Sequence, residues 1–360
     1  MAAALSAALQ SPVGDDGGGI RQLDAMADSS FVEPMRRAGW ECGDGFISHG
    51  LPDGGTLWLY HDTVVGGRMV RNAAGIAATD PHGDATHTMF AGTDARGFIR
   101  QRGAAGERWY WPGVPLPQVQ DRYVHIPATR MLLAPDEAAP FNFHREGGRT
   151  ITYRYRNGEL RRVGTSRLPH VVGWDGYPLS WGMAVAAGGG YVYIYATGAS
   201  PDPEVWGHAV YAARLQTRRL DARRVRGFEL LTRQGWRGGT GNSVSDLVQL
   251  GDGFSTVFAA RWRRGRVLAA VKTHEILGST IDLYRAEAPA LPFHKVRTLV
   301  RLPLRESVLT YWAKAHPTLP APKGKVWGSS NNNPLDGQAG CPDEPERARP
   351  TWYLLPGRLG

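Results

Sequence analysis

Two aspartates, Asp44 and Asp62, stand at the ends of a short glycine-rich segment whose residue types could support acid–base chemistry. The segment between them predicts two strands joined by the turn Pro-Asp-Gly-Gly at residues 52–55, because glycine and aspartate suit such turns. A hairpin returns the chain to its starting edge, so the residues just outside it meet again. Hydrolysis of a glycosidic bond needs two carboxyl groups. The spacing therefore predicts a catalytic pair; the plainer interpretation is that each aspartate only caps a turn.

A second carboxyl group could also come from a later part of the chain. Asp175 is the first candidate, because it lies in the loop Trp-Asp-Gly-Tyr, where aromatic neighbours would desolvate it and raise its pKa. Asp246 and Glu275 follow in that order. We therefore expect Asp44 to be ionised and to activate a water as general base, while one of these three later groups acts as general acid.

Polar and aromatic side chains recur near the same segments, and this mixture is typical of sugar-binding sites. Aromatic faces stack on the apolar side of a sugar ring, while amides and charged groups bind its hydroxyls. The candidate substrate-binding residues are His49, Trp111, Trp181, Lys272, His274, His316, Asn331 and Asn333. We expect Trp111, Trp181 and His316 to line the mouth of a central pocket; the alternative is that the tryptophans pack in the core.

Other familiar chemistries lack their motifs in this sequence. His274 and Glu275 begin like a zinc-protease motif, but Gly278 stands where the second histidine would be. Residues 239–241 lack the third glycine of a dinucleotide-binding loop, and neither a phosphate-binding loop nor a Gly-x-Ser-x-Gly elbow occurs. We therefore expect neither a metal nor a cofactor.

Net charge and hydropathy limit the classes of molecule that this protein is expected to bind. With 42 Lys and Arg residues the net charge is +9, which could favour anionic polymers such as nucleic acid. The plainer interpretation, which we adopt, is that Arg-rich stretches such as 218–226 and 261–266 are solvated edges. No apolar run approaches the roughly 20 residues of a membrane helix, and residues 2–9 lack the basic start of a signal peptide. We expect a monomer that binds neither nucleic acid nor a membrane.

Short strands must position these side chains. Strand-like runs separated by glycine-rich turns occur at residues 56–60, 149–155, 190–195, 209–215, 254–261 and 267–271. Hairpin follows hairpin without a long amphipathic helix, which predicts an all-β sandwich, barrel or propeller. Similar units begin near Gly43, Trp109, Trp181, Ser245 and Ala315. Their separation, about 40 to 70 residues, favours a five-bladed β-propeller over residues 31–356, after a loose arm at residues 1–30.

The two cysteines, Cys42 and Cys341, fit no zinc-binding spacing. Two interpretations are open: the cysteines form a long-range disulfide in an exported protein, or both are buried free thiols. Because the cysteines lie in the first and last blade regions, we expect them to be close enough to bond. Such a bond would tie the two ends of the ring together.

Several motifs occur along the chain in the same order as in a known protein family. The first is the segment from Gly43 to Asp62 with its Leu-Pro-Asp-Gly-Gly-Thr-Leu-Trp-Leu-Tyr core. The later motifs are Trp109-Tyr-Trp-Pro112, Trp181-Gly-Met-Ala-Val, Tyr191-Val-Tyr-Ile-Tyr195, Tyr211-Ala-Ala-Arg214, and Ala313-Lys-Ala-His316-Pro with Asn331-Asn-Asn333. Over about residues 40–335 the sequence resembles a bacterial propeller family that includes the endo-D-arabinanases of glycoside hydrolase family 183. His61 and Ser330 stand where that family's pattern has a glycine and an aromatic residue.

The resemblance implies a secreted bacterial enzyme, extracellular or cell-wall associated, that hydrolyses arabinofuranosyl linkages in arabinan or arabinogalactan. Asp44 and Asp62 match the family's acidic positions in the first blade. We expect an inverting reaction, in which one carboxylate activates water and another group protonates the leaving oxygen. Two other functions stay open: a glycan-binding propeller without catalysis, and a scaffold that binds anionic polymers through its arginines.

Overall fold

The computed structural model is nearly all β, which confirms the all-β part of the predicted fold class. It describes residues 28–79, 85–90, 97–100, 108–117, 123–134, 142–239, 243–303, 307–334 and 350–359. These residues form six sheets. Their helical segments are short, namely η1 (Asp28–Val32), α3 (Glu33–Arg37), η2 (Thr217–Leu220), η3 (Val244–Asp246) and η5 (Gly357–Leu359). None of the helices in this described part is long and apolar enough to cross a membrane.

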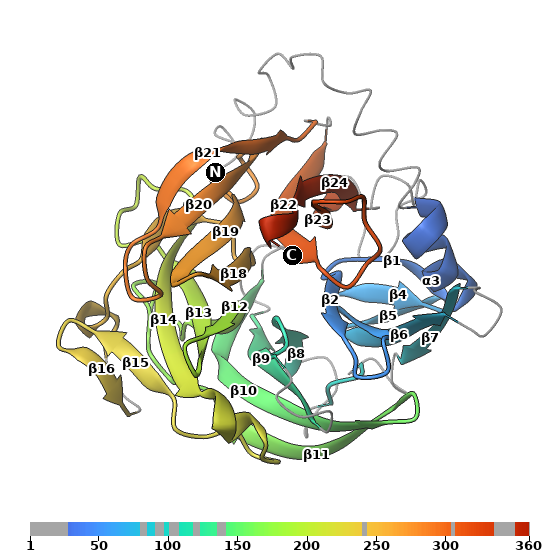
Figure 1. Ribbon diagram of the computed structural model, residues 1–360, viewed down its shortest axis with the longest axis horizontal. Helices are drawn as coiled ribbons and strands as arrows, with labels where there is room; N and C mark the ends of the chain where they lie inside the picture. Colours follow the sequence, from blue (N-terminus) through green and yellow to red (C-terminus); the bar gives the residue numbers. More distant parts are fainter. Residues whose placement is uncertain are drawn as a thin grey trace.

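Five sheets follow one another along the chain, and Figure 1 shows them arranged around a common centre with the first strand of each nearest to it. The first sheet consists of β2 (Ile47–Gly50), β3 (Thr56–Tyr60), β6 (Ala73–Thr79) and β7 (Ala85–Phe90). The second consists of β8 (Arg108–Pro112), β9 (Tyr123–Leu133), β10 (Phe143–Arg156) and β11 (Glu159–Arg167). All the strand pairs within these two sheets are antiparallel.

The later sheets repeat this antiparallel plan. The third consists of β12 (Ser180–Gly188), β13 (Tyr191–Ala199), β14 (His208–Gln216), β15 (Glu229–Thr232), β16 (Gly235–Gly238) and β17 (Gly251–Phe254). The fourth consists of β18 (Ala259–Arg263), β19 (Arg266–Lys272), β20 (Thr280–Ala286) and β21 (His294–Arg301). The fifth consists of β22 (Val308–His316), β23 (Lys325–Pro334) and β24 (Thr351–Pro356). A small additional sheet contains β1 (Trp40–Gly43), β4 (Thr63–Val65) and β5 (Arg68–Val70).

Hydrophobic clusters lie between successive sheets and hold them together. One cluster joins the first and second sheets through Leu57 and Ile126, and another joins the second and third through Leu168 and Val192. Equivalent clusters lie between the third and fourth sheets and between the fourth and fifth. A tryptophan-rich cluster then packs the fifth sheet against the first. The sequence of clusters therefore returns to its starting sheet.

The inner ends of the sheets also contact one another near the centre. Val114 N–H donates to the Gly182 carbonyl at 2.8 Å, and Phe258 N–H donates to the Met183 carbonyl at 3.3 Å. Val257, Met183 and Trp312, from three different sheets or their entry segments, form a small buried cluster there. Apolar side chains from the inner ends of these sheets therefore pack against one another.

Several predicted elements are confirmed, since β3 matches residues 56–60 and the runs 149–155, 209–215 and 267–271 lie within β10, β14 and β19. A glycine-containing turn follows the run 149–155, as the general pattern predicts: Asn157 and Gly158, at φ values of 50° and 77°, join β10 to β11. Such positive φ values suit a two-residue hairpin turn.

Other sequence boundaries were wrong. The run 254–261 is broken, because the Ser255 hydroxyl donates to the Val257 carbonyl at 2.8 Å between β17 and β18. Ser245 does not open the fourth sheet but lies in η3, whose first turn Ser243 caps. Ala315 lies inside β22, because the fifth sheet already begins at Val308.

Cys42 is disulfide-bonded and buried beside Val64. Cys341 lies outside the described residues, so the predicted Cys42–Cys341 pairing remains a prediction. The same holds for the expected arm at residues 1–30, of which only residues 28–30 are described.

Asp282 is a fully buried carboxylate whose replacement should destabilise the fold. It accepts hydrogen bonds from Thr298 at 2.8 Å and Thr280 at 3.1 Å, and it pairs with Lys295 at 2.8 Å. Asp282→Ala should lower the free energy of unfolding by about 3 kcal/mol, because the half-buried hydroxyls of Thr280 and Thr298 lose their acceptor and Lys295 loses its ion pair. Urea denaturation measures this, with Asp202→Ala, an exposed turn residue, as the control expected to change stability by less than about 1 kcal/mol. Equal effects of the two changes would contradict the prediction.

Candidate active site

Asp44 and Asp62 come together at the first sheet, as the hairpin spacing predicts. Asp44 N–H donates to the Asp62 carbonyl at 3.0 Å, and His61 N–H donates to the Asp44 carbonyl at 2.9 Å. Gly45 makes this approach possible, because it has a φ of 103° and a Cβ there would lie 2.5 Å from the His61 nitrogen. The two carboxyl groups are close enough that each influences the protonation of the other.

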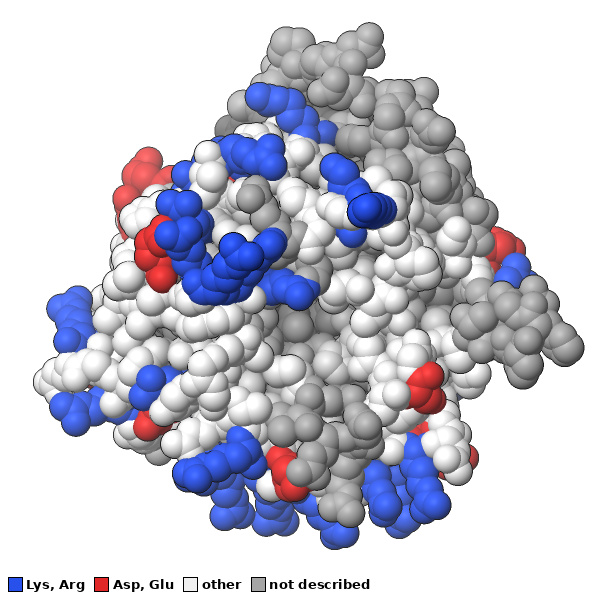
Figure 2. All heavy atoms as spheres, in the orientation of Figure 1, with Lys and Arg blue, Asp and Glu red and all other residues white. Residues whose placement is uncertain are grey.

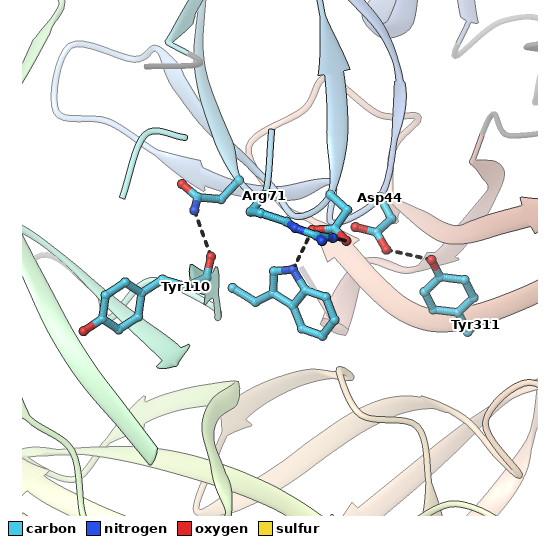
Figure 3. Close-up of polar contacts among 7 residues, drawn as sticks. Asp44, Arg71, Tyr110 and Tyr311 are labelled. Carbon is cyan, nitrogen blue, oxygen red and sulfur yellow. Dashed lines mark hydrogen bonds and ion pairs between the residues drawn. The ribbon is translucent and has the colours of Figure 1, made fainter. Parts of the chain in front are cut away.

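Asp62 is held by two donors, one on each carboxylate oxygen. Arg71 Nη1 lies 2.9 Å from Oδ2, and Trp111 Nε1 donates to Oδ1 at 3.0 Å. Figure 3 shows Arg71 reaching across toward this position from the first sheet. Burial raises the pKa of Asp62, while the Arg71 charge and the two hydrogen bonds oppose that rise. These donors fix the orientation of Asp62 and favour its ionised form.

Asp44 has one bound oxygen and one unbound oxygen. The Tyr311 hydroxyl donates to Oδ2 at 2.8 Å, as Figure 3 shows, whereas the buried Oδ1 has no hydrogen-bond partner among the described residues. Burial, followed by the Asp62 charge, raises the pKa of Asp44 to about 7, against the Tyr311 hydrogen bond and the Lys314 charge. At neutral pH a carboxyl group with such a pKa holds a proton about half of the time. Asp44 can therefore give up or accept a proton under ordinary conditions.

Lys314 supplies a buried positive charge near Asp44. Its side chain is 4% exposed, donates to Asn331 Oδ1 and lies over the Trp312 ring at 5.1 Å. Burial lowers the pKa of Lys314 to about 7, and the Asp44 charge opposes this shift. Lys314 and Asp44 are thus two mutually dependent titrating groups.

An irregularity in β22 lets Tyr311 and Lys314 serve the same site. Residues three apart in a regular strand point to opposite faces. Between these two residues the register with β23 shifts, and Trp312 has a φ of 63°, which is rare for a side chain of this size. Such backbone strain costs about 1–3 kcal/mol and is common at functional sites.

His61 supports the site from within the core. Its Nε2 lies 2.6 Å from the Pro112 carbonyl and must carry the proton that it donates. The ring stacks on Trp111 at 5.4 Å and contacts Trp312 edge-on at 4.7 Å. Burial lowers the pKa of His61 to about 3, so the ring stays neutral. Neutral His61 therefore packs against Trp111, one of the two donors that hold Asp62.

The later carboxyl candidates have other partners. Asp175 forms an ion pair with Arg145 and its side chain is 28% exposed, so the expected desolvated environment is absent. Asp246 accepts from the Ser243 N–H at 3.3 Å as part of a helix cap. Glu275 accepts from the Thr256 N–H at 3.0 Å and from its hydroxyl at 2.8 Å. The structure does not join these three groups to the Asp44–Asp62 pair by a direct contact among the described residues.

Two of the three residues expected at a pocket mouth are in the core. Trp181 is 1% exposed within the cluster between the second and third sheets. His316 is fully buried, binds Ser48 at 2.9 Å and Ser329 at 2.8 Å, and lies beside Trp352. The placement of these two residues at a mouth was wrong, because packing between sheets buries both. Trp111 alone is half-buried and contacts a site carboxylate.

The remaining sugar-binding candidates are dispersed. Asn331 binds Lys314, whereas Asn333 is exposed further along the same strand. Lys272 is fully buried and donates to the backbone carbonyls of Glu275 and Gly278, the latter at 2.5 Å, so it holds a turn. His274 is exposed in that turn, and His49 is half-buried on β2. No interaction joins these last side chains to Asp44 or Asp62 within the described ranges.

Sequence reasoning missed Arg71, Tyr311 and Lys314. Arg71 follows Asp62 by nine residues, but nothing in the sequence distinguishes it from the surface arginines. Lys314 did carry a signal, since it interrupts the apolar run of β22, and a buried lysine is rare unless it is paired. Among the described residues no group of three or more His, Cys, Asp or Glu side chains could hold a metal ion.

The comparisons with known structures show the fold. A candidate hydrolase from Bacteroides ovatus is 18% identical, with a TM-score of 0.63 over 91% of this chain and 89% of that one. A GH43_1 enzyme from Xanthomonas citri is 13% identical (TM-score 0.46, 91% and 93% covered), and the β-xylosidase RS223 is 12% identical (TM-score 0.48, 89% and 93% covered). The likeness to the first shows a shared fold alone, and the two lower scores add no argument.

Sequence comparison identifies the family. No curated protein matches the sequence. The family described as a domain of unknown function, DUF5005, matches residues 30–355, which is most of the chain. The chain therefore belongs to the DUF5005 family.

Proposed function

We propose that this protein is a glycoside hydrolase in which Asp44 and Asp62 carry the reaction. The observation that supports this most directly is the pair itself: two adjacent, half-buried carboxyl groups, both with raised pKa, each held by different donors. Acid–base sites typically contain paired titratable groups whose surroundings give the two groups different pKa values. We further propose that the five sheets are the blades of a β-propeller and that the protein acts outside the cell, which the disulfide at Cys42 favours.

We assign the acid to Asp44 and the base to Asp62, whereas the sequence led us to expect Asp44 as the base and a later carboxyl group as the acid. Asp44, with a pKa of about 7, can hold a proton and give it to the leaving glycosidic oxygen. Asp62, paired with Arg71, stays charged more readily and can take a proton from water. The water oxygen then bonds to the anomeric carbon as the bond from that carbon to the leaving oxygen breaks. The products are a sugar hemiacetal and an alcohol.

The substrate we propose is cell-wall arabinan or arabinogalactan, with cleavage of arabinofuranosyl linkages by inversion. This choice follows the sequence resemblance to endo-D-arabinanases. The inverting course is the one that the sequence led us to expect, and the distance between the carboxyl groups is what distinguishes it from retention in this class of enzyme.

The test is incubation of the protein with arabinan, arabinogalactan, galactan and xylan, followed by analysis of released oligosaccharides. Release from the first two alone supports the proposal, and proton NMR of the first product gives its anomeric configuration. Cleavage of galactan or xylan instead would overturn the substrate class. Binding without any cleavage would favour the glycan-binding alternative.

A further inference from the structure

Trp174 differs from every other tryptophan of the chain in its exposure. All twelve lie within the described residues, and Trp174 is 49% exposed while the other eleven are buried or half-buried. A single exposed apolar side chain is ordinary by itself. The residues around Trp174 are what point to ligand binding by this side chain.

A rigid loop presents Trp174 at its tip. In the loop at residues 171–179, Gly173 N–H donates to the Tyr177 carbonyl at 2.8 Å, and Val172 pairs with Pro178. Tyr177 N–H donates to Asp175 Oδ1 at 3.1 Å, and the ion pair of Asp175 with Arg145 fixes the loop to β10. A preformed loop of this kind loses little conformational entropy when a ligand binds.

The indole itself is also fixed. Its Nε1–H donates to the Tyr211 hydroxyl at 3.1 Å. Tyr211, on β14, is 1% exposed, so a buried and immobile group anchors the exposed ring. Because the Tyr211 oxygen accepts this bond, its own proton remains available to donate to a ligand.

A cavity of about 210 Å³ opens beside the ring. It is lined by Trp174, Tyr211, Arg233, Val244, Ser245 and Gln249, among others. Pockets for drug-sized ligands are roughly 300–1,000 Å³, so this one suits a single small ring. None of these lining residues contacts Asp44 or Asp62 within the described part of the chain, so the cavity is separate from the carboxylate pair.

The lining suits a neutral sugar. The indole face can stack on the apolar side of a sugar ring. The backbone N–H of Arg233 donates to the Asp246 carbonyl, but its guanidinium makes no hydrogen bond or ion pair among the described residues and can donate to hydroxyls, as can the Tyr211 hydroxyl. The positive charge of Arg233 is opposed by the nearby Asp252 carboxylate, which accepts from Gln249 at 2.9 Å and adds to the rise that burial causes in the pKa of Tyr211.

We propose that the Trp174 cavity binds one neutral sugar unit of a polysaccharide at a site apart from the Asp44–Asp62 pair. The polysaccharide class rests on the proposed function; the binding itself does not. A protein with two separated sugar contacts holds a polymer better than a short oligosaccharide, because the second contact is then intramolecular.

The test compares Trp174→Ala and Trp174→Phe with Leu291→Ala, which removes an equally exposed apolar side chain from the fourth sheet. Each change is made in the Asp62→Asn protein, so that the polymer stays intact, and affinity electrophoresis measures binding to arabinan, arabinogalactan, galactan and xylan. Trp174→Ala should weaken binding to the recognised polymer about tenfold, as expected for the loss of an aromatic stack. Trp174→Phe should retain most of the affinity, and Leu291→Ala all of it.

Unchanged binding by Trp174→Ala overturns the proposal, as does absence of binding by the parent protein to all four polymers. A second copy of the chain is the other occupant to exclude. Self-association in sedimentation velocity that disappears in Trp174→Ala would assign the surface to a dimer and overturn the sugar site.

The two proposals fail separately. If the unmodified protein cleaves arabinan while Trp174→Ala binds it as the parent does, the cavity proposal is wrong and the hydrolase proposal stands. If the unmodified protein cleaves none of the polymers but its binding depends on Trp174, the hydrolase proposal is wrong and the cavity proposal stands.

Discussion

Asp62→Asn and Asp44→Asn are each expected to slow glycoside cleavage by about 10²–10⁴-fold, the usual contribution of a positioned acid or base. Asparagine keeps the shape of each side chain and can still accept the hydrogen bonds from Trp111 and Tyr311. It cannot exchange a proton with water or with the leaving oxygen. Initial rates of oligosaccharide release measure the loss, and affinity for the polymer should change much less.

Asp246→Asn is the matched control, because Asp246 is an exposed cap of η3 that the sequence nevertheless marks as a candidate acid. It should leave the cleavage rate unchanged. The double Asp44→Asn, Asp62→Asn protein should lose little more than either single variant, since groups that act as a unit are not additive. Full activity in both single variants would show that the pair is not catalytic.

Much of this site could be predicted from local sequence. The distance along the chain from Asp44 to Asp62 encloses one hairpin, and antiparallel pairing brings the ends of a hairpin together whatever the rest of the fold does. The turn at residues 52–55 is similarly local, as Asp53 Oδ1 accepts from the Gly55 N–H at 3.1 Å. Where geometry is set by neighbours in sequence, the prediction succeeded.

The sequence could not show which distant residues complete the site. Tyr311 lies 267 residues from Asp44, and its role depends on how the fifth sheet packs against the first. Its direction also depends on the irregularity at Trp312, which no alternation pattern reveals. Conversely, His316 has the polarity of a binding residue, but Ser48 and Ser329 satisfy both its ring nitrogens inside the core. Burial decides between these roles, and burial is a property of the assembled sheets.

Surface charge is a second property that composition alone describes poorly. Figure 2 shows Lys and Arg side chains gathered over the sheet β18–β21 and along the edge formed by β10 and β11. Several of these arginines pair with carboxylates, as Arg266 and Arg285 do with Glu287. Part of the positive charge on these sheets is therefore neutralised locally, which the net charge of the sequence does not show.

Tyr311→Phe should move the basic limb of the pH–activity profile to higher pH, and this result would assign the roles within the pair. The Tyr311 hydroxyl donates to Asp44 and favours its charged form, so its removal raises the pKa of Asp44 above about 7. A hydrogen bond to a charged group contributes about 1.5–3 kcal/mol, and each pH unit corresponds to about 1.4 kcal/mol, so we expect a shift of roughly one unit or more. If Asp44 is the acid it must be protonated to act, and activity is lost as pH rises through its pKa. The basic limb therefore moves upward, and the rate at the optimum falls because Asp44 becomes a weaker acid.

If Asp44 were instead the base, the same substitution would move the acidic limb upward, since activity would then be lost as pH falls through the raised pKa. The matched control is Tyr353→Phe, which removes another buried hydroxyl, one that donates to the Ser329 carbonyl at 2.9 Å without contacting Asp44. Rates of arabinan cleavage from pH 4 to 10 in both variants distinguish the cases. If the pH–activity profile moves equally in the two variants, the shift comes from a general loosening of the fold. If the profile moves in neither variant, Asp44 takes no part in the proton transfer.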